Sequence, residues 1–487
     1  MLDESSRDAL RLSALESRLL FVLPLQLVAN LLVPDHDADA FRWRSSDDGG
    51  RDGSNGSASW LLELCVDGLA KWDSLHFLHV ADHGYVFESD LAFYPLFPML
   101  VRWIGVPLDL LLGRKLALVV AGAALNWACF GAGALLLRRL TADLYDADSA
   151  LVGVVLFCLN PAGVFFSACY SEALYFALTM AGLCALYSHP RAEASLRARV
   201  FTASVFFAMA ALTRSNGVTN CFYVAAVVLA HYGTELYQGK QPLLPSLVNV
   251  GFLGFASAAV VLTPLAIHIL LVRQWFCFYQ QPLYGGASYT QHVAYFEDVA
   301  KRGGLVLAGQ SDLMPWCHWR LPLFYGHIQR KYWDVTLFGY YRFVKLPLFA
   351  LAAPTCVLLC GAILKALGWI WRNLPAEILR DCRSRPTLPM ALQGALLLVT
   401  AVLFINVEVI TRLAWSSSPL LCWFCALRFV GRLKRLRRTR LTGRRRLHEL
   451  ALLLWRTGGM EERLVLLYCV GYCVVGCCLH SNFLPWT

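Results

Sequence analysis

The sequence predicts an all-α polytopic membrane protein, a bundle of about eleven transmembrane helices with large lumenal loops. Of its 487 residues, 57% are hydrophobic and 16% are charged, whereas soluble domains have about a quarter of their residues charged. Apolar stretches that approach the roughly 20 residues needed to cross a bilayer core recur along the whole chain. A strongly basic loop near the C-terminal end then indicates how these stretches are oriented in the membrane.

Eleven apolar segments are the candidate transmembrane helices. The first is followed by no small-residue cleavage site, so we expect an uncleaved span rather than a signal peptide. Two of the segments are less clearly full crossings. Asn160-Pro161 interrupts the segment 150–167, and the segment 200–213 is short, so either could be a re-entrant segment rather than a span. The predicted spans are 19–34, 115–137, 150–167, 170–188, 200–213, 217–232, 247–272, 344–370, 388–411, 413–430 and 464–481.

The basic loop 428–446 contains ten Lys or Arg residues and no acidic residue. Such a loop between spans is typical of a cytosolic topology determinant, so the net charge of +10 does not indicate nucleic-acid binding. This orientation places the acidic loop with the sequon at Asn55 in the lumen, where the sequon could be glycosylated. The predicted segments are a cytosolic N-terminus 1–18, a first transmembrane helix 19–34, a large lumenal loop 35–114, helices 115–272, a second lumenal loop 273–343 and C-terminal helices 344–487.

The cysteines and histidines favour neither a disulfide scaffold nor a metal centre. Most of the 17 cysteines lie inside apolar spans, where cysteine behaves as a small hydrophobic residue. The cysteines in the two predicted lumenal loops are Cys65, Cys277 and Cys317, so one disulfide could form there. The spacing of His76, His79 and His83 matches no standard zinc site, and no nucleotide-binding motif is present.

Polar and aromatic clusters fall on the predicted lumenal side. In the first loop, Trp72 precedes Asp73 and His76, which are neighbours on one face of a helix. A carboxylate next to an imidazole and flanked by aromatic side chains could act as a general base. Alternatively, these residues could form the solvated polar face of a helix at the membrane surface. Tyr94 lies in a segment with two prolines, which could form a lipid groove or an interfacial anchor.

Three further groups lie at or near span ends. Glu172 and Arg214 are costly in a membrane unless they are paired or functional. Arg214, followed by Asn216, could hold a phosphate through its planar guanidinium, or could pair with Glu172. Tyr332-Trp333-Asp334 ends the second lumenal loop and offers another carboxylate, or an aromatic belt at the membrane surface.

Six ordered stretches resemble one family, the PIG-V mannosyltransferases that add the second mannose of the glycosylphosphatidylinositol (GPI) anchor, within the GT-C class. Lys331, where a histidine is expected, and the apparent insertion 46–58 depart from its pattern. The six stretches are W-D-S-L-H-F-L-H-V-A-D-H-G-Y (72–85), A-F-Y-P-L-F-P (92–98), A-L-T-R-S-N-G (211–217), Y-W-D-V (332–335), S-S-S-P (416–419) and H-S-N-F-L-P-W-T (480–487).

The resemblance implies a GT-C-like bundle in the endoplasmic reticulum membrane with a lumenal active site. Its donor would be dolichyl-phosphate mannose, and the acceptor would be the first mannose of the GPI precursor, joined in α-1,6 linkage with inversion. No cofactor is certain and metal dependence stays open. Its partners would be the two lipid-linked substrates, with no nucleic acid, and a small membrane subunit is a further candidate partner.

The resemblance also implies residue roles. Asp73 would be the catalytic base, and Arg214 the phosphate partner, with His76 or Lys71 as the next candidates. Two other functions stay open from the sequence alone, which are a non-catalytic subunit of a glycosyltransferase complex and a polytopic lipid transporter. The predicted substrate-binding residues are Trp72, His76, Tyr94, Glu172, Arg214, Asn216, Tyr332, Trp333 and Asp334.

Overall fold

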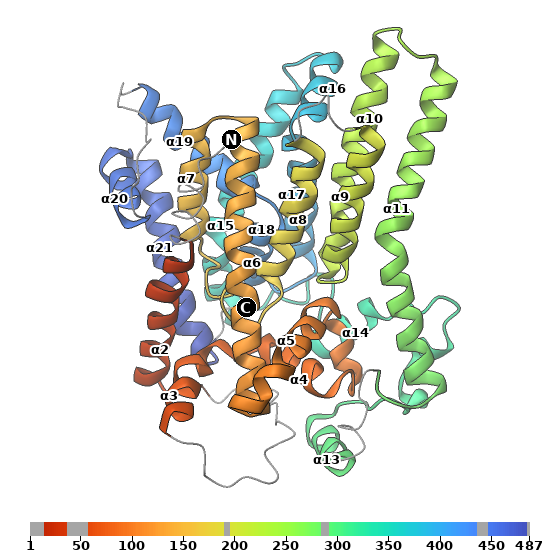
Figure 1. Ribbon diagram of the computed structural model, residues 1–487, viewed down its shortest axis with the longest axis vertical. Helices are drawn as coiled ribbons and strands as arrows, with labels where there is room; N and C mark the ends of the chain where they lie inside the picture. Colours follow the sequence, from red (N-terminus) through yellow and green to blue (C-terminus); the bar gives the residue numbers. More distant parts are fainter. Residues whose placement is uncertain (1–13, 37–56, 189–194, 284–291, 436–446, 485–487) are drawn as a thin grey trace.

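The computed structural model describes residues 14–36, 57–188, 195–283, 292–435 and 447–484, which form a helical bundle (Figure 1). In these residues the extended pairing is limited to two isolated bridges, Tyr85 with Leu283 and Phe87 with Leu307. The predicted all-α class is therefore confirmed. Asn55, the first 13 residues and most of the basic loop lie outside the described residues.

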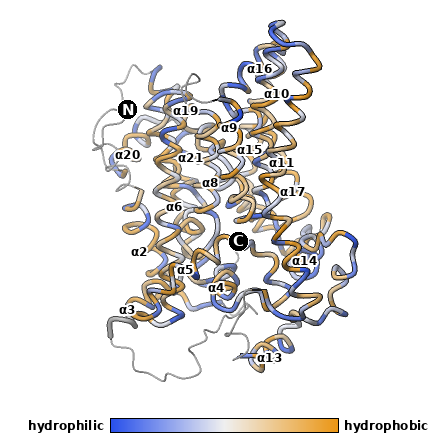
Figure 2. Tube along the Cα trace, turned by 45° about the vertical axis from the view of Figure 1, so that its right-hand side comes forward, coloured by the Kyte–Doolittle hydropathy of each residue, from blue (hydrophilic) through white to orange (hydrophobic). Residues whose placement is uncertain are grey.

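A helix lies in every one of the eleven segments predicted to span the membrane. Apolar residues prevail through the middle of the bundle, and hydrophilic residues are more frequent toward its ends (Figure 2). The helices are α2 (Leu23–Leu32), α6 (Arg114–Leu144), α7 (Ala147–Cys158), α8 (Glu172–Tyr187), α9 (Leu196–Ala211), α10 (Cys221–Tyr237), α11 (Leu243–Arg273), α15 (Leu346–Ile370), α17 (Thr387–Leu403), α19 (Leu420–Arg435) and α21 (Met460–Ser481).

The count of eleven membrane-crossing helices is not confirmed. By length and apolar composition, five helices of the described residues are able to cross a membrane, or up to seven if each of two bent pairs counts as one span. Two further apolar helices, α7 and α8, are shorter than a full crossing requires. The chain is therefore a multi-span membrane protein in which several helices of the bundle are short or broken.

Two predicted spans have different boundaries in the structure. The helix expected over 150–167 ends at Cys158, because Asn160 precedes a proline and its side chain caps the carbonyl oxygen of Phe157 at 2.7 Å. The break expected between 411 and 413 is absent, since α18 (Ile410–Ser417) runs through it. The helix α17 ends earlier, at Leu403, and the chain bends by 72° after α18 at Ser418-Pro419, where proline cannot continue a helix.

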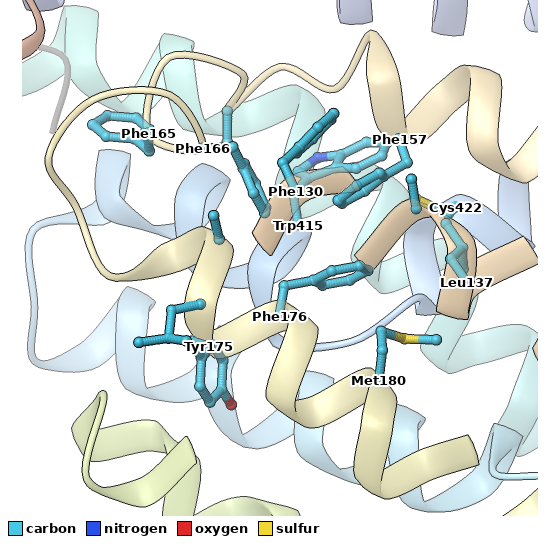
Figure 3. Packing of buried hydrophobic residues seen from close by; sticks show 14 of the residues in the cluster. Phe130, Leu137, Phe157, Phe165, Phe166, Tyr175, Phe176, Met180, Trp415 and Cys422 are labelled. Atoms are coloured by element: carbon cyan, nitrogen blue, oxygen red, sulfur yellow. The ribbon is translucent and has the colours of Figure 1, made fainter. Parts of the chain in front are cut away.

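The core of the bundle is a stack of aromatic side chains from α6, α7 and α8 (Figure 3). The ring centroid of Phe157 lies 4.6 Å from that of Phe130 and 4.5 Å from that of Phe176. A Cβ atom at Gly133 would lie 2.9 Å from the ring of Phe176, so the small residue lets α6 and α8 approach closely, as is common between membrane helices. This packing fixes the start of α8 beneath the site described below.

The two predicted lumenal loops pack together at one end of the bundle. The first contains α3 (Ser57–Val66), α4 (Asp73–His83) and α5 (Leu96–Leu112), and the second contains α13 (Val293–Gly303) and α14 (Tyr325–Trp333). The backbone N–H groups of Tyr85 and Glu88 donate to the carbonyl oxygens of Leu283 and Val306, both at 2.8 Å. At the opposite end lie α16 (Pro375–Ser384) and α20 (Leu447–Thr457) (Figure 1).

A disulfide joins Cys277 to Cys317 within the second predicted lumenal loop, across 40 residues of sequence. It uses two of the three loop cysteines noted in the sequence, and Cys65 is free. Disulfides persist in oxidising compartments such as the endoplasmic reticulum lumen. The bond therefore supports the predicted lumenal position of this loop.

We expect a Cys277–Cys317 linked peptide in non-reducing digests of the membrane-extracted protein, and we expect Cys277→Ser to remove it. Closing a loop of this length is worth about 2–4 kcal/mol, so the variant should unfold at a lower temperature. Cys65→Ser is the matched control and should leave the linked peptide in place. An absent linked peptide in the wild-type protein would contradict the lumenal assignment of this loop.

Candidate active site

The candidate site lies where α4 begins, at the end of the bundle that carries both predicted lumenal loops. Asp73 is the first residue of α4, where the helix dipole favours a negative charge. Its backbone N–H donates to the hydroxyl oxygen of Tyr170 at 3.2 Å. Trp72, just before it, has a φ of 56°, a backbone conformation that is uncommon for a non-glycine residue. This local strain turns the chain into α4 and directs Asp73 toward the bundle.

The closest charged partner of Asp73 is Arg412 of α18. Arg412 Nη1 lies 2.7 Å from Asp73 Oδ2 and 3.8 Å from Glu172 Oε1. The guanidinium group also lies over the rings of Phe165 and Tyr170, at 5.5 and 5.6 Å from their centroids. Arg412 therefore joins the two carboxylates of the site.

A second arginine pairs with the second carboxylate. Arg214 Nη1 is in close ionic contact with Glu172 Oε1 and donates to Ser171 Oγ at 3.1 Å. Glu172 is completely buried, whereas the Asp73 side chain keeps 23% of its surface exposed. The four groups form an alternating row, Asp73, Arg412, Glu172 and Arg214, whose formal charges cancel. Of the two carboxylates in this row, only that of Asp73 is accessible to a substrate.

Two opposing effects act on the pKa of the Asp73 carboxyl. Burial, the largest single effect, raises this pKa, but the charge and hydrogen bond of Arg412, together with the charges of His76 and Arg214, outweigh burial. The pKa of Asp73 is therefore below its ordinary value. The carboxylate is ionised at neutral pH and able to accept a proton, although it is a weaker base while Arg412 remains bound to it.

Aromatic side chains from both predicted lumenal loops lie beside this row. The ring of His76 stacks on Phe93, with centroids 4.7 Å apart, and Trp333 packs edge-on against His76 at 6.1 Å. On another side, Tyr94 packs against Tyr325 at 5.7 Å. These rings form an apolar wall beside Asp73, which is the usual lining of a site for an organic ligand.

The remaining predicted site residues lie at different distances from the charged row. Asn216 donates to Ser417 Oγ at 2.9 Å, and Ser417 belongs to the same helix as Arg412. Trp72 packs against Phe483, 5.8 Å between centroids. Asp334 does not join the group, since it is 69% exposed and pairs with Arg342 at 3.2 Å. Trp72, His76, Glu172, Arg214 and Asn216 therefore lie at the charged row, and Tyr94 and Trp333 lie in its aromatic wall, whereas the hydroxyl of Tyr332 donates to Glu88 at 2.8 Å and Asp334 lies at the surface.

The sequence profile of the family described as Mannosyltransferase (PIG-V) matches residues 7–487. The chain belongs to the PIG-V mannosyltransferase family. It is therefore a glycosyltransferase, and the charged row with its aromatic wall is the candidate active site of this PIG-V family enzyme.

Curated relatives of the PIG-V family enzyme match it along its whole length. GPI mannosyltransferase 2 of Drosophila melanogaster is 32% identical and covers 97% of this chain and 98% of its own. GPI alpha-1,6-mannosyltransferase 2 of Mus musculus is 32% identical, with 100% of both chains covered, and that of Homo sapiens is 31% identical, with 100% and 99% covered.

A solved structure with a similar trace is the oligosaccharyltransferase of Archaeoglobus fulgidus in the apo form. It is 14% identical with a TM-score of 0.46, and the match covers 98% of this chain and 56% of that one.

Arg412 of the PIG-V family enzyme was assigned no role from the sequence. The available signal was an arginine inside an otherwise apolar segment, next to Ser416–Ser418. The sequence did not indicate the partner of Arg412, because Asp73 lies 339 residues away along the chain. Arg214, expected to hold a phosphate or to pair with Glu172, makes that pair in the structure.

The charged row of the PIG-V family enzyme offers only two carboxylates, Asp73 and Glu172, and each is bound to a guanidinium group. Across the described ranges, no group of three or more His, Cys, Asp or Glu side chains is placed to hold a metal ion. The two arginines of the row, Arg412 and Arg214, are candidate groups for binding an anion. Their planar guanidinium groups suit a phosphate, which can accept two hydrogen bonds from each.

Proposed function

We propose that this enzyme transfers mannose from dolichyl-phosphate mannose to the first mannose of the GPI precursor, forming an α-1,6 linkage with inversion. The 2.7 Å pair between Asp73 and Arg412 is the observation that carries the proposal. It joins a substrate-accessible base to a cation that suits a phosphate, and a single displacement from a sugar phosphate needs both groups. Full-length relatives named for this reaction support the choice of substrates.

The proposed reaction is one displacement at the anomeric carbon of the donor. The acceptor hydroxyl oxygen attacks this carbon, and the bond from the carbon to the phosphate oxygen breaks. The hydroxyl proton passes to the Asp73 carboxylate, and dolichyl phosphate leaves with the bonding electron pair. Arg412 and Arg214 hold the negative charge that builds up on the departing phosphate.

In the resting site, Asp73 is engaged with Arg412, which keeps it a weak base. An incoming donor phosphate competes for the same guanidinium group and so loosens its hold on Asp73. The carboxylate then regains basicity as the donor binds. In this way the enzyme would couple donor binding to activation of the acceptor hydroxyl.

We place the site on the lumenal face of the endoplasmic reticulum membrane. The supporting observations are the Cys277–Cys317 disulfide and the position of the site at the end of the bundle opposite α16, which carries Arg380 and Arg383. Basic segments next to spans are generally cytosolic. Both substrates are lipid-linked, so they would enter from the membrane. A small membrane subunit is a further proposed partner.

Complementation tests the proposed function directly. In cells stalled at the one-mannose GPI precursor, expression of the wild-type chain should restore two-mannose and later precursors, measured by lipid extraction and thin-layer chromatography. The purified protein in detergent should make the same α-1,6 product from dolichyl-phosphate mannose. Restoration in cells without transfer by the purified protein would favour a subunit of a complex. Failure in both assays would refute the proposal.

A further inference from the structure

Glu88 is a completely buried carboxylate that lies outside the charged row. Its two oxygen atoms accept three hydrogen bonds, all from the second lumenal loop. Trp316 Nε1 donates to Oε1 at 2.7 Å, and Lys331 Nζ and Tyr332 Oη donate to Oε2 at 2.6 and 2.8 Å. A single side chain of the first loop therefore binds residues 228 to 244 positions away.

This arrangement ties the position of α14 to Glu88. A buried carboxylate is tolerated only when it is paired and hydrogen-bonded, and removing one partner of a buried ion pair costs more than an exposed pair is worth. Lys331 and Tyr332 are in the last turn of α14. The hydrogen bonds to Glu88 therefore hold this turn against the first loop, beside α4 and α5 (Figure 1).

The residue after Tyr332 forms part of the wall of the candidate active site. Trp333 packs against His76 and, at 5.8 Å, against Phe93. His76 is one helical turn from Asp73 on α4. The position of the Trp333 ring beside the reacting carboxylate thus depends on the turn that Glu88 anchors. An aromatic face at this place suits the apolar C–H face of a sugar ring.

We propose that Glu88 is a positioning residue that fixes Trp333 against His76, so that the second lumenal loop supplies a sugar-binding wall of the active site. The inference rests on the proposed function. Glu88 acts through Trp333 and touches neither substrate. Replacing Glu88 should therefore lower the activity by no more than the contribution that Trp333 makes to the activity.

A double-mutant cycle tests this coupling. We expect Glu88→Gln to lower kcat/KM for mannose transfer about 10-fold and Trp333→Ala about 30-fold, with the double variant no worse than Trp333→Ala alone. Independent effects would instead multiply, giving a loss of about 300-fold in the double variant. A multiplicative result would overturn the proposal. A merely structural role for Glu88 would also lower the unfolding temperature without this dependence on Trp333.

Partner variants keep the test decisive if Glu88→Gln does not fold. Lys331→Met should reproduce its loss and its non-additivity with Trp333→Ala, and Lys331→Arg, which keeps the charge, should restore most of the activity. The control is Arg342→Ala, which breaks the exposed pair with Asp334 in the same loop and should have no effect. An inactive wild-type protein would refute the proposed function, whereas an active protein with an additive cycle would refute only this inference.

Discussion

Replacing Asp73 with asparagine is expected to lower kcat for mannose transfer by about 10²–10⁴-fold, the usual contribution of a positioned general base. Asparagine has nearly the same shape, and its carbonyl oxygen can still accept the hydrogen bond from Arg412. What it loses is the ability to accept the proton of the acceptor hydroxyl. The rate should be measured with the purified protein and radiolabelled dolichyl-phosphate mannose, alongside the cell complementation assay.

The stability of the Asp73→Asn protein separates loss of the base from loss of the fold. Asp73 keeps 23% of its side chain exposed, so the neutral residue should leave the elution profile and unfolding temperature close to wild type. Asp298→Asn, in a surface pair with Arg302 on α13, is the matched carboxylate-to-amide control and should retain full activity. Near-normal transfer by Asp73→Asn would remove Asp73 from the mechanism.

The location of the helices was predictable because it follows from local composition. Apolar length is a property of consecutive residues, so each of the eleven predicted segments contains a helix. Where helices break depends on tertiary context. Pro161 lies in turns just beyond the end of α7, and Pro419 lies between α18 and α19, but Pro264 lies inside α11 without ending it. Proline alone therefore did not distinguish these outcomes.

The chemistry of the site was predictable only in part. Glu172 and Arg214 stood out in the sequence because ionisable residues at span ends are costly without a role, and the predicted topology placed them on the same side of the membrane as Asp73 in the first loop. Their pairing did not follow, because Arg412 reaches Asp73 across 339 residues. The partners and burial of Asp334 and Glu88 were likewise not predictable from the sequence. Each is a carboxylate in a polar segment, yet one faces Arg342 at the surface and the other is completely buried.

Lys331 illustrates how a partner explains a departure from a family pattern. Lys331 occupies a position where the resemblance predicts histidine, and the sequence alone gives no reason for the lysine. In the structure its ammonium group lies 2.6 Å from the buried Glu88 carboxylate. A long cationic side chain can reach this carboxylate from the end of α14, and that requirement is visible only once both loops are in place.

Replacing Arg412 with methionine is expected to lower kcat/KM by about 10²–10³-fold, the range seen when one preorganised donor to a developing anion is removed. It should also move the pH dependence. Because Arg412 holds the pKa of Asp73 below its ordinary value, its loss raises this pKa. A base works only when it is deprotonated, so activity falls as the pH drops through its pKa. The acidic limb of kcat/KM should therefore lie at a higher pH in Arg412→Met than in the wild-type enzyme.

Two further variants test whether the acidic limb of the pH dependence of kcat/KM belongs to the Asp73–Arg412 pair. Arg412→Lys keeps a positive charge near Asp73, so its limb should stay close to the wild-type position while the loss of the planar guanidinium still weakens phosphate binding. The double variant Asp73→Asn/Arg412→Met has no carboxylate at position 73, and its residual activity should show no limb in the same pH range. Glu172 keeps its ionic contact with Arg214 in all of these proteins, so the buried carboxylate remains paired. A limb in Arg412→Met that is unchanged, or moved to lower pH, would mean that the group being titrated is not Asp73.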